Sequence, residues 1–148
     1  MNIIYDKICI IGIGLIGASI ALAARRAGLA GHISGCEADA GKVDEIKRLG
    51  LVDSVTTDAV AAVKDADLVV MAVPVGVMGG LAETIIPQMK PGAVLTDTGS
   101  TKRSVIRDVD PHATDAIHWL PSHPLAGTEH SGPAAGFAEL FDGRYWLV

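Results

Sequence analysis

The loop from Ser122 to Gly132 holds the densest group of side chains in this chain that could do acid–base chemistry. Two histidines, a glutamate, a threonine and two serines fall within it. His123 directly follows an expected strand, where a side chain is well positioned, and an imidazole can accept a proton at neutral pH. The loop therefore predicts His123 as a general base, with a structural hydrogen bond in a tight, proline-containing loop as the alternative. His130 could simply be a solvated loop residue.

A second polar segment, Thr98-Gly99-Ser100-Thr101-Lys102, follows another expected strand. Ser100 precedes a helix, so its hydroxyl could cap that helix, contact a cofactor, or do both. The spacing of His123 and His130 does not match a zinc site, and we expect no metal.

A glycine-rich motif near the N-terminus indicates the ligand beside which these groups would act. It fits the pattern G-x-G-x-x-G between an expected strand and an expected helix, in the run Gly12-Ile13-Gly14-Leu15-Ile16-Gly17. The first glycine permits a tight turn, the second lets the backbone approach a pyrophosphate, and the third lets the helix pack closely on the sheet. The phosphates would face free N–H groups at the helix N-terminus. The motif predicts a dinucleotide site, with ordinary glycine turns as the alternative.

Glu37 lies 20 residues after Gly17, at the end of the second expected strand. A carboxylate at this position can hold both ribose hydroxyls of the adenosine half, and it repels a 2′-phosphate. We therefore expect NAD rather than NADP as the cofactor. Lys42, a few residues later, keeps NADP possible, and a solvated surface acid is the alternative interpretation of Glu37.

The elements that must position these groups alternate between short β-branched runs and longer helical runs, which is typical of a parallel sheet covered by helices. The expected strands are 7–11, 32–36, 52–56, 68–73, 94–97, 117–120 and 145–148. The expected helices are 15–27, 39–49, 58–64, 79–89 (cut short by Pro87) and 102–109, with one helical turn at 137–141. We predict an α/β fold of the Rossmann type, a doubly wound and mostly parallel sheet, in one domain spanning residues 1–148.

In such a sheet the carboxyl ends of the strands line the ligand crevice. Val73 ends the fourth expected strand and Pro74 follows it, Ser100 follows the fifth and His123 follows the sixth. We therefore expect all four residues at one edge of the sheet, beside the cofactor.

Size, composition and charge exclude several classes of protein. The chain has 148 residues, is 49% apolar and 20% charged, and carries a net charge of −5. These values are typical of a single globular domain, and no basic face indicates a nucleic-acid partner. The apolar runs are too short for a membrane span and the N-terminus lacks a signal-peptide pattern, so we expect a cytoplasmic location. Cys9 and Cys36 lie in apolar runs and are expected to be free buried thiols.

Three motifs together resemble the prephenate/arogenate (cyclohexadienyl) dehydrogenase family over essentially the whole chain. They are Gly12-x-Gly14-Leu15-Ile16-Gly17-x-Ser19, Asp97-x-Gly99-Ser100-x-Lys102 and the loop from Ser122 to Gly132, which is the specific one. The resemblance implies an NAD(P)-dependent oxidation of prephenate or arogenate, in which carbon dioxide is lost and the ring becomes aromatic on the way to tyrosine. The alternatives are another Rossmann dehydrogenase, of the 6-phosphogluconate or hydroxyacid type, and a non-catalytic nucleotide-sensing domain.

The resemblance also implies roles for individual residues. His123 matches the histidine that binds the ring C4 hydroxyl and accepts its proton as hydride leaves for the nicotinamide. Ser100 matches a serine that hydrogen-bonds near the same hydroxyl and the nicotinamide, so it belongs to the catalytic, cofactor and substrate contacts alike. The implied substrate contacts in the loop are Thr128, Glu129 and Ser131, with His130 as a candidate for discriminating between the two substrates.

The family's helical second domain forms a homodimer and supplies an arginine for the substrate carboxylate, and we expect that domain to be missing from this chain. Arg144, the arginine nearest to the His123 loop, is expected on or beside a strand. The 148 residues are therefore expected to bind NAD⁺ but to oxidise little or no prephenate alone. Apart from the small-molecule substrate and a second copy of the full-length enzyme, no partner is expected.

Overall fold

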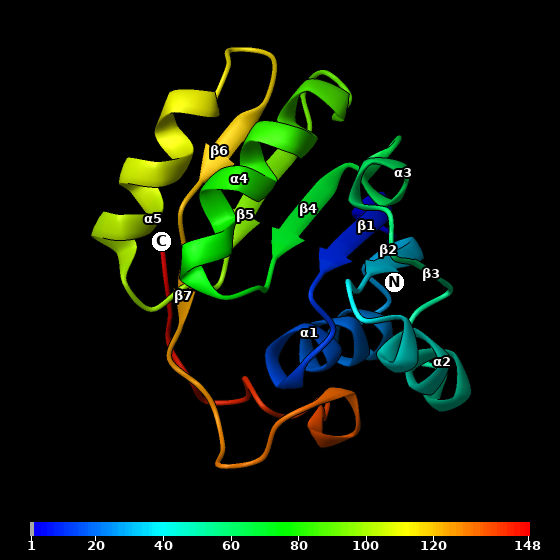
Figure 1. The fold of residues 1–148 in the computed structure, drawn as a ribbon. Coiled ribbons are helices and arrows are strands. Elements are labelled where there is room, and N and C mark those ends of the chain that lie inside the picture. The colour runs from blue at the N-terminus through cyan, green and yellow to red at the C-terminus, as the bar shows by residue number, and fades with distance from the viewer. Residues whose placement is uncertain (1) are drawn as a thin grey trace.

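The computed structural model describes residues 2–148, whose main feature is a six-stranded parallel sheet with helices on both faces (Figure 1). The strands are β1 (Tyr5–Ile11), β2 (Ala30–Cys36), β3 (Ser54–Thr56), β4 (Leu68–Met71), β5 (Val94–Asp97) and β6 (His118–Leu120). Their order across the sheet is β3-β2-β1-β4-β5-β6, so the direction of winding reverses between β1 and β4. The predicted doubly wound Rossmann fold is confirmed, and its ligand crevice is expected at this switch point.

The two faces of the sheet carry separate hydrophobic cores. Helices α1 (Leu15–Arg26) and α2 (Ala40–Leu49) cover one face, and α3 (Ala59–Val63), α4 (Val75–Ile85) and α5 (Lys102–Val109) cover the other (Figure 1). Successive side chains of a strand point to opposite faces. Ile8 and Ile10 of β1 accordingly join the first core, whereas Cys9 and Ile11 join the second. No helix formed by residues 2–148 has the combined length and hydropathy needed to cross a membrane.

Local capping sets the boundaries of α2 where the sequence predicts them. The side chain of Asp39 accepts a hydrogen bond from the N–H of Gly41 at 2.9 Å, which stabilises the first turn. Gly50 ends the helix in the left-handed region, with φ of 63°. The predicted start at Asp39 and stop at Gly50 are therefore confirmed.

Helix α4 begins at Val75, so the predicted start at Gly79 is four residues too late. Pro74 caps the helix, and a proline at a helix start loses nothing because its N–H would have no partner there. The glycines of α4 weaken its helical pattern but serve packing, since a Cβ on Gly79 would lie 3.0 Å from Cβ of Asp108 in α5. Pro87 does shorten the helix as predicted: α4 ends at Ile85 and a 3₁₀ turn follows.

The segment after β6 differs from the prediction in two places. The Ser122–Gly132 loop is not irregular throughout, because β7 (His123–Pro124) pairs antiparallel with β8 (Trp146–Leu147). Residues 137–141 form hydrogen-bonded turns rather than a helix, and the helical turn is a 3₁₀ turn at Pro133–Ala135. A single helical turn has little stability of its own, so contacts elsewhere decide where it forms.

Candidate dinucleotide site

The turn between β1 and α1 requires glycine at two positions. Gly12 has φ of +90°, and a Cβ there would lie 2.4 Å from the carbonyl oxygen of Ala72. A Cβ on Gly17 would lie 1.9 Å from the carbonyl oxygen of Gly12, so α1 begins in direct contact with the turn. These contacts are the tight turn and close helix packing expected of the first and third glycines.

The space around the Cβ position of Gly14 is empty, whereas the same space at Gly12 and Gly17 is crowded. No atom lies within 4 Å of the position that its Cβ would take. Gly14 is also the N-cap residue of α1, and no side chain caps that end of the helix. The N–H groups of the first turn are therefore left for a ligand or water, at the positive end of the helix dipole. A pyrophosphate fits this position because it supplies the acceptors and the negative charge that the helix end lacks.

Glu37 follows β2, and its carboxylate reaches back to the glycine turn. Oε2 accepts a hydrogen bond from the N–H of Ile13 at 3.2 Å, and Oε1 accepts one from the N–H of Asp39 at 3.4 Å. Both bonds hold the carboxylate next to the turn in which Gly14 lies. The side chain of Ile13 is fully buried in the core, so this residue contributes its backbone to the site.

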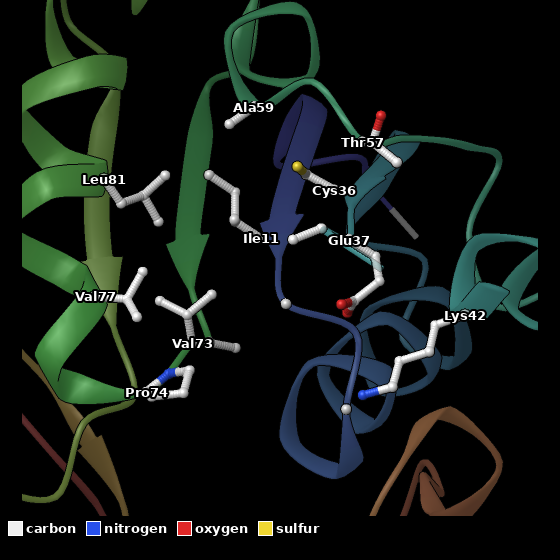
Figure 2. A pocket seen from close by; sticks show the side chains of 14 residues that line it. Ile11, Cys36, Glu37, Lys42, Thr57, Ala59, Val73, Pro74, Val77 and Leu81 are labelled. Carbon is white, nitrogen blue, oxygen red and sulfur yellow. The ribbon is translucent and has the colours of Figure 1, made fainter. Parts of the chain in front are cut away.

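A cavity of about 410 Å³ opens beside Glu37 and the glycine turn. Figure 2 shows the side chains of Glu37 and Lys42 on one side of it, with Val73 and Pro74 on the other. A mostly apolar cavity with a few polar groups is typical of a small-molecule site. The remaining lining is contributed by Ile11, Gly12, Gly14, Cys36, Ala38, Thr57, Ala59, Ala72, Val77 and Leu81.

The structure therefore brings part of the predicted cofactor set together in one cavity. Gly12, Gly14, Glu37, Val73 and Pro74 line the cavity. The others do not line it: Ile13, Leu15, Ile16 and Gly17 form the rest of the turn and the start of α1, and Ser100 lies after β5.

Cys36 lines the cavity, and Cys9 lies on the neighbouring strand β1. Both thiols are free and buried, as predicted. Burial raises the pKa of each thiol from 9.0 to about 11. A thiol that stays protonated at neutral pH is a poor nucleophile, so neither cysteine is a candidate for covalent chemistry.

Both thiols of the folded chain are expected to react with a disulfide reagent about 100-fold more slowly at pH 8 than ordinary thiols do. The reason is that the thiolate fraction falls about tenfold with each added pKa unit, and the shift is from 9.0 to about 11. The measurement is the absorbance of released thiolate from an aromatic disulfide, in buffer and in concentrated urea. A folded thiol that reacts at the rate seen in urea contradicts the prediction.

Ser100 and His123 lie further along the same edge of the sheet, after β5 and β6. Ser100 is exposed, and Thr101 rather than Ser100 is the N-cap residue of α5, so the alternative in which the Ser100 hydroxyl caps this helix is not observed. His123 is half-buried in β7, where its backbone pairs with Leu147. Neither side chain has a hydrogen-bond partner within residues 2–148, so a structural hydrogen bond of the imidazole is not observed. Both groups are available to a ligand.

The remaining predicted substrate contacts form an exposed turn. Thr128, Glu129, His130 and Ser131 are all exposed. The N–H of His130 donates to Oγ1 of Thr128 at 3.1 Å, and the His130 ring lies 3.4 Å from the carboxylate of Glu129. The structure groups these residues with one another, and they do not line the cavity. Among residues 2–148, no cluster of three metal-ligating side chains is present.

Two buried residues with no role predicted from the sequence join the segments that carry Ser100 and His123. Asp97 is 0% exposed and Ser122 is 3% exposed. The carboxylate of Asp97 accepts hydrogen bonds from the N–H of Gly99 at 2.8 Å and from the N–H of Ser122 at 3.0 Å. The available signal was an aspartate at the end of an apolar strand, because a buried carboxylate must have partners.

Ser19 belongs to the first of the three motifs, and the structure shows what it contacts. Its buried hydroxyl accepts a hydrogen bond from the N–H of Phe137 at 3.1 Å. A Cβ on Gly136 would lie 2.6 Å from Cβ of Ala18, so the same segment packs tightly on α1. The chain that returns from the exposed turn is thereby attached to the first helix of the dinucleotide site.

A helix N-terminus whose N–H groups have no side-chain cap, next to a carboxylate at the end of the second strand, is typical of a dinucleotide-binding domain. Comparison with known proteins agrees with this class. The family model for the nucleotide-binding domain of prephenate dehydrogenase matches residues 20–148. The chain belongs to this family, which confirms the resemblance drawn from its motifs.

Individual relatives and solved structures are named as dehydrogenases of this kind. A cyclohexadienyl dehydrogenase from Zymomonas mobilis is 44% identical over 138 residues, which are 93% of this chain and 47% of that protein. The structure is similar to prephenate dehydrogenase from Aquifex aeolicus in complex with hydroxyphenyl propionate and NAD⁺, with a TM-score of 0.86 and 27% identity over 95% of this chain and 49% of that one. Synechocystis arogenate dehydrogenase gives a TM-score of 0.84 and 26% identity over 95% and 48% of the two chains. The chain spans about half the length of these relatives.

Proposed function

We propose that this chain is the NAD-binding and proton-accepting part of a dehydrogenase that oxidises prephenate or arogenate, with loss of carbon dioxide, on the way to tyrosine. The observation that carries the proposal is the position of His123, an imidazole without a hydrogen-bond partner within residues 2–148. It follows β6 at the same sheet edge as the dinucleotide cavity. Membership of the prephenate dehydrogenase family and the names of the relatives support the substrate class.

In the proposed reaction, the neutral imidazole of His123 binds the ring hydroxyl of the substrate and accepts its proton as hydride departs. The Ser100 hydroxyl hydrogen-bonds near the same oxygen and orients it toward the base. NAD⁺, when bound, supplies the hydride acceptor. Because aromatisation of the ring drives the loss of carbon dioxide, this chain needs to supply only a base and correct positioning. The exposed residues Thr128, Glu129, His130 and Ser131 line the substrate entrance in this proposal.

NAD rather than NADP is the proposed cofactor. The carboxylate of Glu37 is held beside the glycine turn by the N–H of Ile13 at 3.2 Å, where it can accept hydrogen bonds from ribose hydroxyls. A 2′-phosphate would bring a second negative charge to the same place. Lys42 is the one cation among the residues that line the cavity. Its positive charge reduces this repulsion, but the negative charge of Glu37 remains.

Glu37→Ser is expected to weaken NAD⁺ binding by about 10- to 100-fold, since a charge-assisted hydrogen bond contributes about 1.5–3 kcal/mol. The same change removes the repulsion of a 2′-phosphate, so the preference for NAD⁺ over NADP⁺ narrows. Calorimetric titration of both cofactors measures the two dissociation constants. Glu83→Ser, at an exposed glutamate on α4, is the control and should leave both constants unchanged. An unaltered preference in Glu37→Ser would overturn the assignment.

We also propose that a second, helical domain completes the substrate site and forms a homodimer in the full-length enzyme. The relatives are about twice as long as this chain, which supports a further domain. Arg144 is exposed in the segment before β8, and no hydrogen bond or ion pair joins its side chain to His123 among the described residues. The 148 residues alone are therefore expected to bind NAD⁺ and oxidise little prephenate.

Free thiols at Cys9 and Cys36 suit the proposed cytoplasmic location, which is reducing.

The proposed activity is tested by following NADH absorbance with the full gene product that carries this chain. Prephenate and arogenate are each offered with NAD⁺ and with NADP⁺. NADH formation with at least one of the two substrates is the expected result. No reduction of either cofactor by either substrate, in a protein that binds NAD⁺, contradicts the proposed reaction and leaves another Rossmann dehydrogenase or a nucleotide sensor as the explanation.

A further inference from the structure

The two carboxylate oxygens of Asp97 accept hydrogen bonds from two different segments of the chain. Oδ2 accepts the N–H of Gly99, at 2.8 Å, immediately before Ser100. Oδ1 accepts the N–H of Ser122, at 3.0 Å, immediately before His123. Asp97 is completely buried, so water cannot replace either bond. One side chain thus holds both of the residues that precede the proposed active groups.

We propose that Asp97 is a positioning residue that sets the geometry between the Ser100 hydroxyl and the His123 imidazole. This inference rests on the proposed function, in which both groups act on one substrate hydroxyl. Ser100 is one peptide beyond the bond to Oδ2, and His123 is one peptide beyond the bond to Oδ1. Because the two oxygens belong to one planar group, the two segments cannot move independently of each other while both bonds are made.

The negative charge of the Asp97 carboxylate strengthens its hydrogen bonds and also requires a partner of opposite charge. Hydrogen bonds to an ionised carboxylate are stronger than those between neutral groups, and a buried charge must be paired. The ammonium of Lys102, in the first turn of α5, pairs with Oδ2. The carboxylate is therefore fixed by one cation and two N–H groups, which leaves it little freedom to turn away.

A second set of bonds holds Ser122 from its other side. The Ser122 hydroxyl donates to the carbonyl oxygen of Asp97 at 2.7 Å and lies 2.8 Å from Oγ1 of Thr96. The indole N–H of Trp146 donates to the same hydroxyl at 2.9 Å, which attaches β8 to the position where β7 begins. Within residues 2–148, no buried side-chain polar atom lacks a partner, so this network is satisfied throughout.

Asp97→Asn separates the positioning role from simple packing, because asparagine has the same shape but only one accepting oxygen. Its amide can satisfy the N–H of Gly99 or that of Ser122, and its NH₂ group must face the other one. The segment that loses its acceptor is then free to shift. A displacement of about 1 Å between reacting groups can lower a rate 100-fold.

Asp67 supplies a matched control at the amino ends of the strands, opposite to the end where Asp97 lies. It precedes β4, its Oδ2 accepts the N–H of Lys7 at 2.9 Å, and its Oδ1 pairs with the ammonium of Lys90. Asp67 therefore makes the same kinds of bond as Asp97, to a backbone N–H and a lysine, without contacting the segments of Ser100 or His123. Asp67→Asn removes such bonds at a distance from the proposed active groups.

The experiment uses the full gene product and measures three quantities for the parent, Asp97→Asn and Asp67→Asn. They are kcat with the substrate that the parent oxidises, the Kd for NAD⁺, and amide hydrogen exchange in residues 98–101 and 121–125. Asp97→Asn should lower kcat at least about 100-fold, keep the Kd within about threefold of the parent, and speed exchange in at least one of the two segments. Asp67→Asn should change none of the three by more than about threefold.

Three results overturn the inference: a kcat for Asp97→Asn near the parent value, unchanged exchange in both segments, or an equal loss of kcat in Asp67→Asn. If Asp97→Asn does not fold, the Asp97→Asn/Lys102→Met double variant takes its place. It leaves no unpaired ammonium and carries the same expectations. If the parent oxidises neither prephenate nor arogenate, the proposed function fails, and hydrogen exchange alone then decides whether Asp97 orders both segments.

Discussion

Replacing His123 by asparagine is expected to lower kcat for prephenate or arogenate oxidation by about 10²- to 10⁴-fold, the usual contribution of a positioned general base. Asparagine keeps the size and hydrogen-bonding capacity of the side chain, but its amide cannot accept the hydroxyl proton at neutral pH. NAD⁺ affinity should change less than about threefold, because the cofactor is held at the glycine turn and Glu37, outside the reach of this substitution. The measurements are steady-state NADH production and calorimetric titration of NAD⁺ with the full gene product.

His118→Asn is the matched control for this variant. His118 is exposed on β6, a few residues before His123, and has no proposed contact with substrate. It should retain the parent's kcat. If His123→Asn oxidises substrate as fast as the parent, the imidazole is not the base, and a nucleotide sensor or a different base must be considered. Equal losses in both histidine variants would indicate a general effect on the fold.

Gly14→Ala is expected to weaken NAD⁺ binding by about 10- to 100-fold, which corresponds to losing about one charged hydrogen bond. No atom lies within 4 Å of the new Cβ in the chain itself, so the methyl group enters the space assigned to the pyrophosphate. The free energy of unfolding should fall by about 1 kcal/mol or less, since glycine is preferred to alanine at an N-cap by about that amount. Calorimetric titration of NAD⁺ and urea unfolding measure the two effects separately.

Gly80→Ala is the control for this experiment. Gly80 lies within α4 and also has no atom within 4 Å of its added Cβ, but it does not line the cavity. It should bind NAD⁺ like the parent. Tight NAD⁺ binding by Gly14→Ala would mean that the pyrophosphate does not approach the second glycine, and the dinucleotide site would have to be placed elsewhere.

The parts of the fold that could be predicted are those whose signals are local. The apolar run of β1, the glycine turn and the start of α1 follow one another in the sequence, and each is specified by residues within a few positions. Asp39 and Gly50 mark the ends of α2 for the same reason. The start of helix α4 has a weak local signal, because its glycines lower helix propensity while tight packing against α5 requires one of them.

The parts of the site that were missed depend on contacts between distant segments. Asp97 and Ser122 are 25 residues apart, and no local pattern pairs a strand-end aspartate with one particular N–H. The short strand at His123 exists because Leu147 and Trp146 return beside it, after an exposed turn and a 3₁₀ turn. The sequence could place Ser100 and His123 at one edge of the sheet, but the side chain that ties their segments together was visible only in three dimensions.

A crystal structure of the full gene product with NAD⁺ tests the central claim most directly. The claim predicts the diphosphate against the first turn of α1 at Gly14, the adenosine ribose on the carboxylate of Glu37, and the nicotinamide ring beside Ser100 and His123. A nicotinamide that points away from His123, or a diphosphate bound elsewhere, would contradict it.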